Sequence, residues 1–379
     1  MNYTIVSTDD HLQEPPDLWT ERMSRAKWGD RIPHIRRGDD GSDCWFIDGK
    51  PFTKYGMPYL SSVQGTLEGR TTPKTWEEVP EISYVPSERV KAMDRDGVDV
   101  HTLFANVSGI AGNTFSNPEY SEDFRLECIR ACNDYQMDAF GDPYPGRFIT
   151  LAQVPMWDAQ QAVAEARRMA ERGVKGITFA FPQQFGYPHI SDKHWDPLWA
   201  FAQEANLSVN FHIGSGGGMG IDRGSLSRSA PSFAAAEGST KAVSANVQVM
   251  TTLLFAGIMP RFPKLKIVSS ESGAGWVPYL LEVADHHWEH HNCRRDGMDL
   301  RPSEYFRRQC YVNFWFESAG LKMMRDHVSL DNVMFGSDFP HPTGTWPDTK
   351  KYIERSVDGL THEEREKVLF RNGRKVYGL

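Results

Sequence analysis

The chain has 379 residues, of which 40% are hydrophobic and 24% are charged, and its formal net charge is −8 at pH 7. This length allows one elaborated α/β barrel or two medium domains, and the composition excludes global disorder. The negative charge, without any run of Lys or Arg, excludes nucleic-acid binding through phosphate neutralisation. Aromatic residues make up 12% of the chain, which suits a large core and a pocket for a planar ligand.

The sequence shows no signal for a membrane or for secretion. The N-terminus lacks a basic segment followed by an apolar one, so no signal peptide is predicted. No apolar stretch approaches the roughly 20 residues that cross a bilayer. The cysteines lack tightly paired motifs and are interpreted as reduced thiols: Cys44, Cys128, Cys132, Cys293 and Cys310. We therefore expect a cytoplasmic protein without a membrane partner.

Short β-like runs alternate with amphipathic helical patterns along the chain. The predicted strands are 3–8, 98–104, 148–154, 176–181, 208–212, 266–270, 311–316 and 332–336. The predicted helices are 121–140, 159–172, 197–205, 275–291, 320–328 and 361–377. Strands that alternate with helices in this way predict a parallel (β/α)8 TIM barrel, formed as a single domain by residues 1–379.

Two stretches interrupt this alternation. Residues 20–86 are rich in Gly, Pro, Asp and aromatic residues, and a structureless loop of that length is rare in a compact domain. We therefore expect a distorted barrel with an insertion after strand 1, whose small elements cover the barrel mouth. Residues 214–240 begin Gly-Ser-Gly-Gly-Gly-Met-Gly, which predicts a long, mobile glycine-rich loop after strand 5. The alternative is a disordered surface insertion.

Acidic and imidazole side chains stand at the ends of strands that are far apart in the sequence. Asp9 and His11 follow the first strand, His212 ends the fifth, and Asp338 follows the eighth. The two-residue period of a strand places Asp9 and His11 on one face and Asp10 on the other. The carboxyl ends of parallel barrel strands form the face that carries active sites. Because carboxylates and imidazoles suit Zn²⁺, Mn²⁺ or Fe²⁺, these residues predict a metal site.

Each of these residues also has a purely structural interpretation. Asp338 could cap a helix from its Ser-Asp-Phe-Pro turn, and His212 could be a hydrogen-bonded core residue. Glu14, before Pro15, and His341 could be loop residues bonded to the local backbone.

The motifs of this chain resemble, in order and spacing, the amidohydrolase-related proteins of the aminocarboxymuconate-semialdehyde decarboxylase type. The motifs that carry the resemblance are Asp9-x-His11-x-x-Glu14-Pro15, Met93-Asp94-x-Asp96-Gly97-Val98-Asp99, Gly146-Arg147-Phe148, Trp195-x-Pro197-Leu198-Trp199, Phe211-His212, Arg261-Phe262-Pro263 and Phe335-Gly336-Ser337-Asp338-x-Pro340-His341. The resemblance covers nearly the whole chain except residues 20–86 and the glycine-rich loop.

This resemblance implies a distorted barrel with one divalent metal ion bound by Asp9, His11, His212 and Asp338. Zinc is the first expectation, with manganese and iron as alternatives. One departure concerns Glu271, which stands where the superfamily often has a histidine. Its role as a ligand, a base or an acceptor for a ligand is open. No strand-four lysine is placed to bridge two metal ions, so a site for one metal ion is favoured.

The resemblance favours non-oxidative decarboxylation of a small aromatic or conjugated carboxylic acid. Hydrolysis by metal-activated water is the alternative, and a non-catalytic ligand-binding barrel is a third possibility. Asp338 is the expected proton carrier, with His341 stabilising oxyanion charge and Glu271 as a further catalytic residue. The residues expected to contact the substrate are Glu14, Gly214 and Trp276. A homodimer is expected from the family alone.

A histidine-rich segment lies outside these motifs, at Asp285-His286-His287-x-x-His290-His291. Its histidines have the one-turn spacing of zinc ligands on a helix. However, Glu289 is misplaced for an H-E-x-x-H motif, and the segment lies on an expected outer helix. We interpret it as a solvated or interface surface that can bind adventitious metal.

Overall fold

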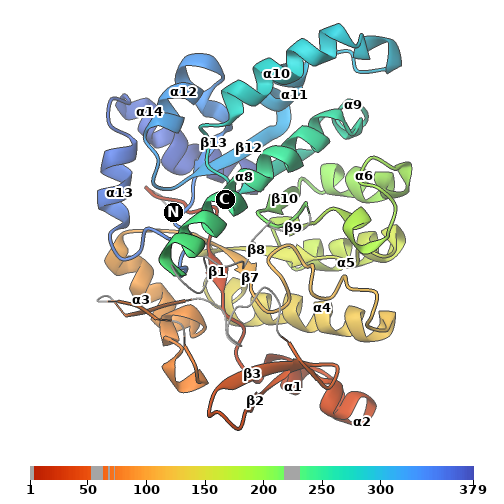
Figure 1. The fold of residues 1–379 in the computed structure, drawn as a ribbon, viewed down its shortest axis with the longest axis vertical. Helices are drawn as coiled ribbons and strands as arrows, with labels where there is room; N and C mark the ends of the chain where they lie inside the picture. The colour runs from red at the N-terminus through yellow and green to blue at the C-terminus, as the bar shows by residue number, and fades with distance from the viewer. Residues whose placement is uncertain (1–3, 53–62, 67–68, 72, 217–230) are drawn as a thin grey trace.

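A computed structural model describes residues 4–52, 63–66, 69–71, 73–216 and 231–379 of the protein. Its centre is an eight-stranded sheet in which the strands are parallel and follow one another in chain order (Figure 1). The strands are β1 (His11–Leu12), β7 (His101–Ala105), β8 (Phe148–Gln153), β9 (Gly176–Thr178), β10 (Ser208–His212), β11 (Lys266–Ser270), β12 (Cys310–Phe314) and β13 (Val333–Phe335). This order is that of a (β/α)8 barrel.

Helices lie between consecutive strands and surround the sheet (Figure 1). They are α3 (Pro86–Asp96), α4 (Glu122–Gln136), α5 (Ala159–Glu171), α6 (Asp196–Glu204), α8 (Pro231–Phe255), α9 (Ile258–Arg261), α10 (Val277–His290), α11 (Pro302–Gln309) and α12 (Ala319–His327). The helices α13 (Thr349–Ser356), α14 (His362–Glu366) and α15 (Asn372–Tyr377) follow the last strand. The predicted alternation of strands and helices is therefore confirmed.

The first and last strands of the sheet are joined by backbone contacts. Asp10 forms a parallel bridge with Phe339, and the Asp338 amide donates a hydrogen bond to the Asp9 carbonyl at 2.8 Å. These contacts close the curled sheet. They also place the N-terminal and C-terminal segments of the chain side by side.

The first strand begins later than the sequence predicts. Of the predicted strand 3–8 the structure describes residues 4–8, and these have only an isolated bridge at Val6; the regular strand is β1. The hydroxyl of Ser7 donates to the Asp10 carboxylate at 2.8 Å, and that of Thr8 donates to the Phe335 carbonyl at 2.8 Å. Such side-chain hydrogen bonds compete with the regular backbone hydrogen bonds between strands, which accounts for the late start of β1.

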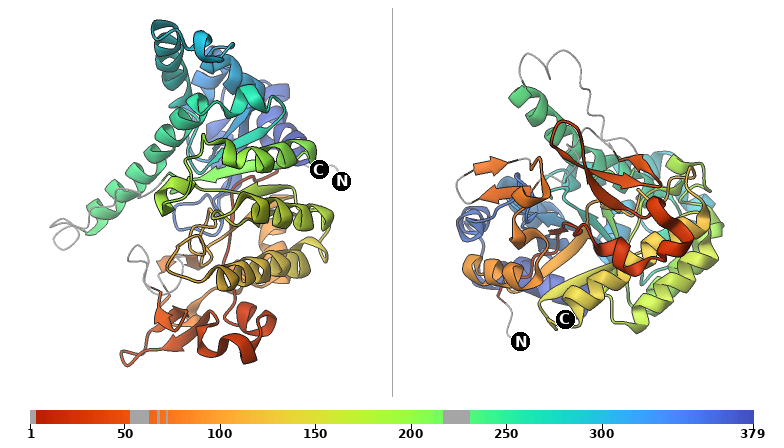
Figure 2. Two further views of the ribbon diagram at one scale, coloured as in Figure 1. Left: turned by 90° about the vertical axis from the view of Figure 1, so that its right-hand side faces the viewer. Right: turned by 90° about the horizontal axis from the view of Figure 1, so that it is seen from below.

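Residues between β1 and α3 form small elements at one end of the molecule (Figures 1 and 2). They are the helices α1 (Leu18–Arg22) and α2 (Arg25–Trp28), an antiparallel sheet of β2 (His34–Arg37), β3 (Asp43–Ile47) and β4 (Lys50–Pro51), and the pair β5 (Val63–Thr66) and β6 (Gly69–Thr71). Trp28 and Trp45 of this insertion share a buried cluster with Phe115 and with Phe124 of α4. The insertion is thus anchored on α4 and on the segment that follows β7.

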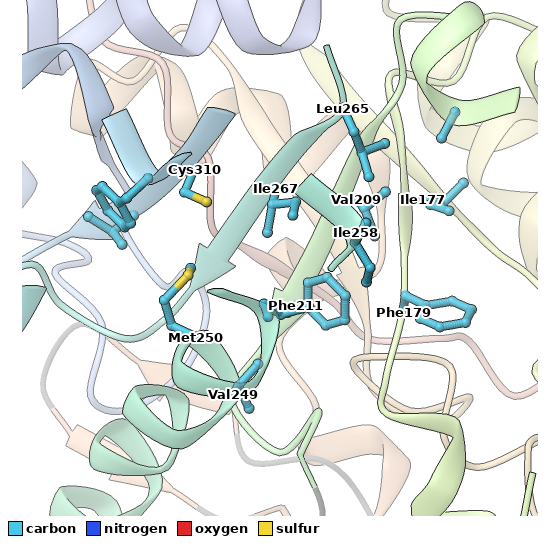
Figure 3. Close-up of a cluster of buried hydrophobic side chains, with 14 of the residues drawn as sticks. Ile177, Phe179, Val209, Phe211, Val249, Met250, Ile258, Leu265, Ile267 and Cys310 are labelled. Atoms are coloured by element: carbon cyan, nitrogen blue, oxygen red, sulfur yellow. The ribbon is translucent and has the colours of Figure 1, made fainter. Parts of the chain in front are cut away.

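The main core lies between the strands and the outer helices (Figure 3). Val209 and Phe211 of β10 are buried against Val249 of α8, whereas Asn210 and His212 occupy the alternate positions of the strand. Because side chains alternate along a strand, the apolar contacts that hold β10 to α8 direct His212 to the inner face. Each fully buried large apolar side chain contributes roughly 1.5–3 kcal/mol.

The glycine-rich loop is shorter than the predicted 214–240. α8 begins at Pro231, so the last part of that stretch is helical, and residues 217–230 lie outside the described residues. The triplet Ala234-Ala235-Ala236 explains the early start, because alanine is the strongest helix former. Figure 2 shows that the N-terminal end of α8 extends away from the barrel.

Across the described residues, no helix is long and apolar enough to cross a lipid bilayer. The five cysteines are free thiols, and all except Cys293 are buried. The interpretation of the cysteines as reduced thiols is therefore consistent with the structure.

We predict that Gly336→Ala destabilises the barrel at its closure. A Cβ at Gly336 would lie 2.6 Å from the Cβ of Asp9, so the first strand would have to shift. Overpacking of this kind costs about 1–3 kcal/mol in the free energy of unfolding. The control is Gly38→Ala, whose Cβ would lie 3.1 Å from the flexible Asp40 carboxylate and 3.5 Å from the Ser42 carbonyl, an ordinary contact. Urea denaturation of both variants tests this; equal stability would refute it.

Candidate metal centre

The structure brings the four predicted ligands together at the carboxyl ends of the strands. His212 Nε2 lies 3.3 Å from Asp9 Oδ1, and His11 Nε2 lies 3.1 Å from Asp338 Oδ1. All four side chains are buried. Asp10, on the opposite face as predicted, bonds instead to neighbouring strands.

Glu271 is a fifth member of this cluster. Its Oε2 lies 3.1 Å from His212 Nε2 and 3.9 Å from His11 Nε2. Glu271 has a φ of +50° and Asp338 has a φ of +57°. This left-handed conformation costs on the order of 1–3 kcal/mol for a non-glycine residue and is concentrated at functional sites. The backbone after β11 and β13 is therefore bent in the same way where each carboxylate joins the cluster.

Five ligand atoms in the cluster are buried and have no hydrogen-bond partner within the described part of the chain. They are Asp9 Oδ1, His11 Nε2, His212 Nε2, Glu271 Oε2 and Asp338 Oδ1. Burying polar atoms without partners costs about 1–3 kcal/mol each, and an unpaired charge costs far more. One divalent cation would satisfy all five. The donor set of carboxylate oxygens and imidazole nitrogens fits zinc, manganese or iron.

The electrostatics of the five side chains also favour a bound cation. Burial raises the pKa of Glu271 well above its ordinary value, and Asp338 and Asp9 raise it further. Burial also raises the pKa of Asp9, although His212 opposes this. For His11, burial lowers the pKa well below its ordinary value, which keeps the imidazole neutral. A neutral imidazole is the form that binds metal, and a cation would favour the ionised carboxylates.

Asp338 and His341 form a close pair beside the cluster. His341 Nδ1 lies 2.9 Å from Asp338 Oδ1, and its ring stacks on His11 with centroids 3.7 Å apart. Burial alone would raise the pKa of Asp338, but His341 and His11 outweigh burial and lower it. Burial lowers the pKa of His341, but Asp338 reverses this and raises it. Thr343 donates to the other Asp338 oxygen at 3.1 Å. These contacts favour an ionised Asp338 and a protonated His341.

Behind the cluster lies a buried network that the sequence did not reveal. The Arg89 guanidinium of α3 bonds to the backbone carbonyl of His11 and lies 3.2 Å from His101 Nδ1. It also lies 4.5 Å from the centre of the Phe339 ring. Burial lowers the pKa of Arg89 to about 10, so it stays charged at neutral pH, beside Asp10. Arg89 therefore fixes the backbone next to two candidate ligands, His11 and Asp338.

Asp10 completes this network. Its carboxylate accepts hydrogen bonds from Ser7, from Ser337 and from the Thr102 amide at 2.9 Å. Three strands are thus tied together by one carboxylate. The role of Arg89 could not be predicted from the local sequence. In an amphipathic helix, the sequence pattern does not distinguish a buried arginine from a solvent-exposed one.

Glu14, one of the residues predicted to contact the substrate, is bonded to the protein backbone. Glu14 accepts hydrogen bonds from the amides of Asn106, Val107 and Ser108 at 3.2, 2.9 and 2.9 Å, and from the Ser108 hydroxyl at 3.0 Å. Both its oxygens are therefore used to hold the segment after β7; the bonds are to backbone, as the structural interpretation expected, but to backbone far away in the sequence and not to the local loop.

Gly214 and Trp276 lie close in sequence to the candidate ligands. Gly214 follows His212 with a φ of +85°, a conformation that requires glycine. The Trp276 indole donates to the Ser272 carbonyl at 2.8 Å, which fixes its ring in the segment that follows Glu271.

We predict that Arg89→Lys weakens binding of Mn²⁺ about 10–100-fold, the usual effect of losing a residue that orients metal ligands. Lysine keeps the positive charge beside Asp10 but cannot reach the His11 carbonyl and His101 together. The matched control is Arg95→Lys, on the exposed face of the same helix. Competition with a chelating dye gives the affinity, and circular dichroism confirms the fold. Equal affinity of both folded variants would show that Arg89 does not position the site.

Comparisons with known proteins match most of the chain. Residues 75–379 match the amidohydrolase family model Amidohydro_2. A 2-amino-3-carboxymuconate-6-semialdehyde decarboxylase from Dictyostelium discoideum is 22% identical over 311 residues, which cover 81% of this chain and 80% of that protein.

Among solved structures, an amidohydrolase from Mycobacterium avium subsp. paratuberculosis K-10 superposes with a TM-score of 0.77 and 21% identity, over 100% of both chains. A 5-carboxyvanillate decarboxylase from Novosphingobium aromaticivorans, complexed with manganese and 4-hydroxy-3-methoxy-5-nitrobenzoic acid, has a TM-score of 0.67 and 17% identity, over 100% of this chain and 97% of that one. The family model spans most of the sequence, and the chain therefore belongs to the amidohydrolase family.

Proposed function

We propose that this protein catalyses the metal-dependent, non-oxidative decarboxylation of a small aromatic or conjugated carboxylic acid. The observation that carries this proposal is the convergence, at the carboxyl ends of the barrel strands, of five buried ligand atoms that have no hydrogen-bond partner among the described residues. The relatives support the reaction class, since the Dictyostelium and Novosphingobium proteins are decarboxylases. A barrel that had lost its metal would not be expected to keep the complete set of ligands.

We infer that one divalent ion, Zn²⁺, Mn²⁺ or Fe²⁺, is held by Asp9, His11, His212 and Asp338, with Glu271 as a further carboxylate beside them. When bound, the ion would polarise and orient the carboxylate of the substrate. The Mn²⁺ in the Novosphingobium structure supports manganese as a candidate alongside zinc. Three carboxylates around two imidazoles form a donor set that hard divalent ions accept well.

Decarboxylation requires a proton at the carbon that loses CO₂. The bond between that carbon and the carboxylate carbon breaks, and the electron pair left behind takes up the proton. Asp338 and His341, 2.9 Å apart, are the proposed proton carriers. His341 Nε2 is buried and unpartnered among the described residues, so it can donate to an oxygen on which negative charge develops. Glu271, in contact with His212, is the further candidate for proton transfer.

The insertion after β1 is proposed to cover the mouth of the barrel. It shares a buried cluster with residues that follow β7, at the same end of the strands as the candidate ligands. Together with the segments around Gly214 and Trp276, it would enclose a small planar substrate and exclude water. Glu14 is not part of this proposal, because its oxygens are already bonded. The homodimer and the cytoplasmic location stay predictions.

Hydrolysis by activated water is the competing reaction, and the products distinguish the two. We would incubate the metal-loaded protein with a panel of hydroxybenzoic and conjugated carboxylic acids in isotopically labelled water. Decarboxylation releases CO₂ and places one solvent hydrogen on the former carboxyl-bearing carbon. Hydrolysis places solvent oxygen in a product instead. Labelled oxygen in the product, with no CO₂ released, would replace our proposal by a hydrolase.

Asp338→Asn should lower kcat about 10²–10⁴-fold, because the amide cannot exchange a proton as the carboxylate does. The matched control is Asp331→Asn, an exposed residue that precedes the same strand and whose carboxylate pairs with half-buried Lys367 at 2.7 Å. Steady-state release of CO₂ measures both variants. A near-normal rate for folded Asp338→Asn would remove this residue as the proton carrier.

His212→Ala should lower the metal content of the purified protein. Its Nε2 contacts both Asp9 and Glu271, so its loss removes a donor from the centre of the cluster. Plasma mass spectrometry of untagged protein gives the metal content per chain. About one ion per wild-type chain is expected. Unchanged occupancy in the variant would exclude His212 as a ligand.

A further inference from the structure

The end of α10 carries four histidines that the proposed reaction does not use. His286, His287, His290 and His291 are all exposed. In Figure 1 this helix lies at the opposite end of the long axis from the insertion after β1. The four side chains are therefore remote from the elements proposed to cover the barrel mouth.

Their rings form a closed four-sided cluster. His286 stacks on His290 with centroids 6.1 Å apart, and His287 stacks on His291 at 5.9 Å. The sides are completed by His286 with His287 at 5.3 Å and His290 with His291 at 5.2 Å. Each stacked pair spans one helical turn, so two imidazoles face the same direction. This is the arrangement in which paired histidines on a helix chelate a metal ion.

Nothing in the described part of the chain competes for these rings, since none of the four imidazoles has a hydrogen bond or an ion pair there. The neighbouring carboxylates are engaged elsewhere. Asp285 accepts hydrogen bonds from the Ser303 amide and hydroxyl at 2.9 and 2.6 Å, and Glu289 lies 3.8 Å from Arg301. The imidazole nitrogens are therefore the donor atoms that the four rings themselves present.

The position of the cluster on the helix also favours a cation. α10 has 14 residues; His287 and His290 lie in its last turn, His286 lies just before that turn, and His291 follows the helix. The carbonyl end of a helix carries a partial negative charge that attracts a nearby cation. The helix thus adds an attraction that the same histidines would lack in its middle.

We propose that this cluster, His286, His287, His290 and His291, is a second metal site. It would bind one late transition-metal ion, Cu²⁺, Ni²⁺ or Zn²⁺, at the surface. Nitrogen-only donors select these ions, whereas Mg²⁺, Ca²⁺ and Mn²⁺ prefer oxygen. The two sites of the protein therefore differ in chemistry: the barrel centre is rich in carboxylates, and the α10 site has none. Water completes the coordination at the exposed site, which makes it the weaker of the two.

The test uses untagged, manganese-loaded protein titrated with Ni²⁺ by calorimetry at pH 7.5. The wild type should bind about one Ni²⁺ per chain beyond the Mn²⁺ already present. His286→Gln with His290→Gln should weaken this binding at least about tenfold. Replacing all four histidines with glutamine should abolish it. Manganese content and turnover should stay unchanged in both variants.

The control replaces two exposed histidines outside the cluster, His327→Gln with His362→Gln, and should bind Ni²⁺ like the wild type. Circular dichroism verifies that each variant is folded. Two results would overturn the proposal: no Ni²⁺ bound by the wild type beyond the barrel site, or wild-type binding by the variant that lacks all four histidines. Loss of Mn²⁺ in step with Ni²⁺ uptake would also overturn it, because the nickel would then occupy the barrel.

Discussion

The contact between the first and last strands is the constraint on which the candidate site depends. The hydrogen bond from the Asp338 amide to the Asp9 carbonyl joins residues that are separated by most of the chain. Asp10, bonded to Ser7, Ser337 and Thr102, holds the strands together immediately behind it. Without this closure, Asp9 and His11 would lie at the edge of an open sheet, away from Asp338.

The same constraint concentrates negative charge in the interior. Asp9, Glu271 and Asp338 are buried within a few ångströms of His11 and His212, and two of these carboxylates extend from left-handed backbone. A fold gains nothing in stability from such an arrangement unless a cation compensates it. The apolar packing between β10 and α8 and the network around Arg89 hold the side chains in place in spite of this repulsion. The barrel therefore presents a rigid, preorganised set of donors.

The candidate centre in the barrel and the histidine cluster on α10 differ in the donor atoms they present, and the reason is how each is assembled. At the barrel centre, strands converge, so donors of different types from distant parts of the chain meet in a buried volume. At the end of α10, the donors come from one helix, and its periodicity alone brings the imidazoles together. The first arrangement requires the whole fold, whereas the second requires only a helix.

Local sequence was sufficient for the alternation of strands and helices, since 208–212 and 266–270 coincide with β10 and β11. It was also sufficient for the placement of Asp9 and His11 on one face of a strand, because the period of a strand is a local property. The four proposed ligands were found because each lies at or just after the end of a β-like run in the sequence. The role of Glu271 was open, and only the fold shows that its carboxylate touches His212. The late start of β1, the bonded oxygens of Glu14 and the position of Arg89 behind His11 depend on contacts between residues far apart in the chain. Such contacts leave no periodic trace in the sequence, so the tertiary structure alone decided them.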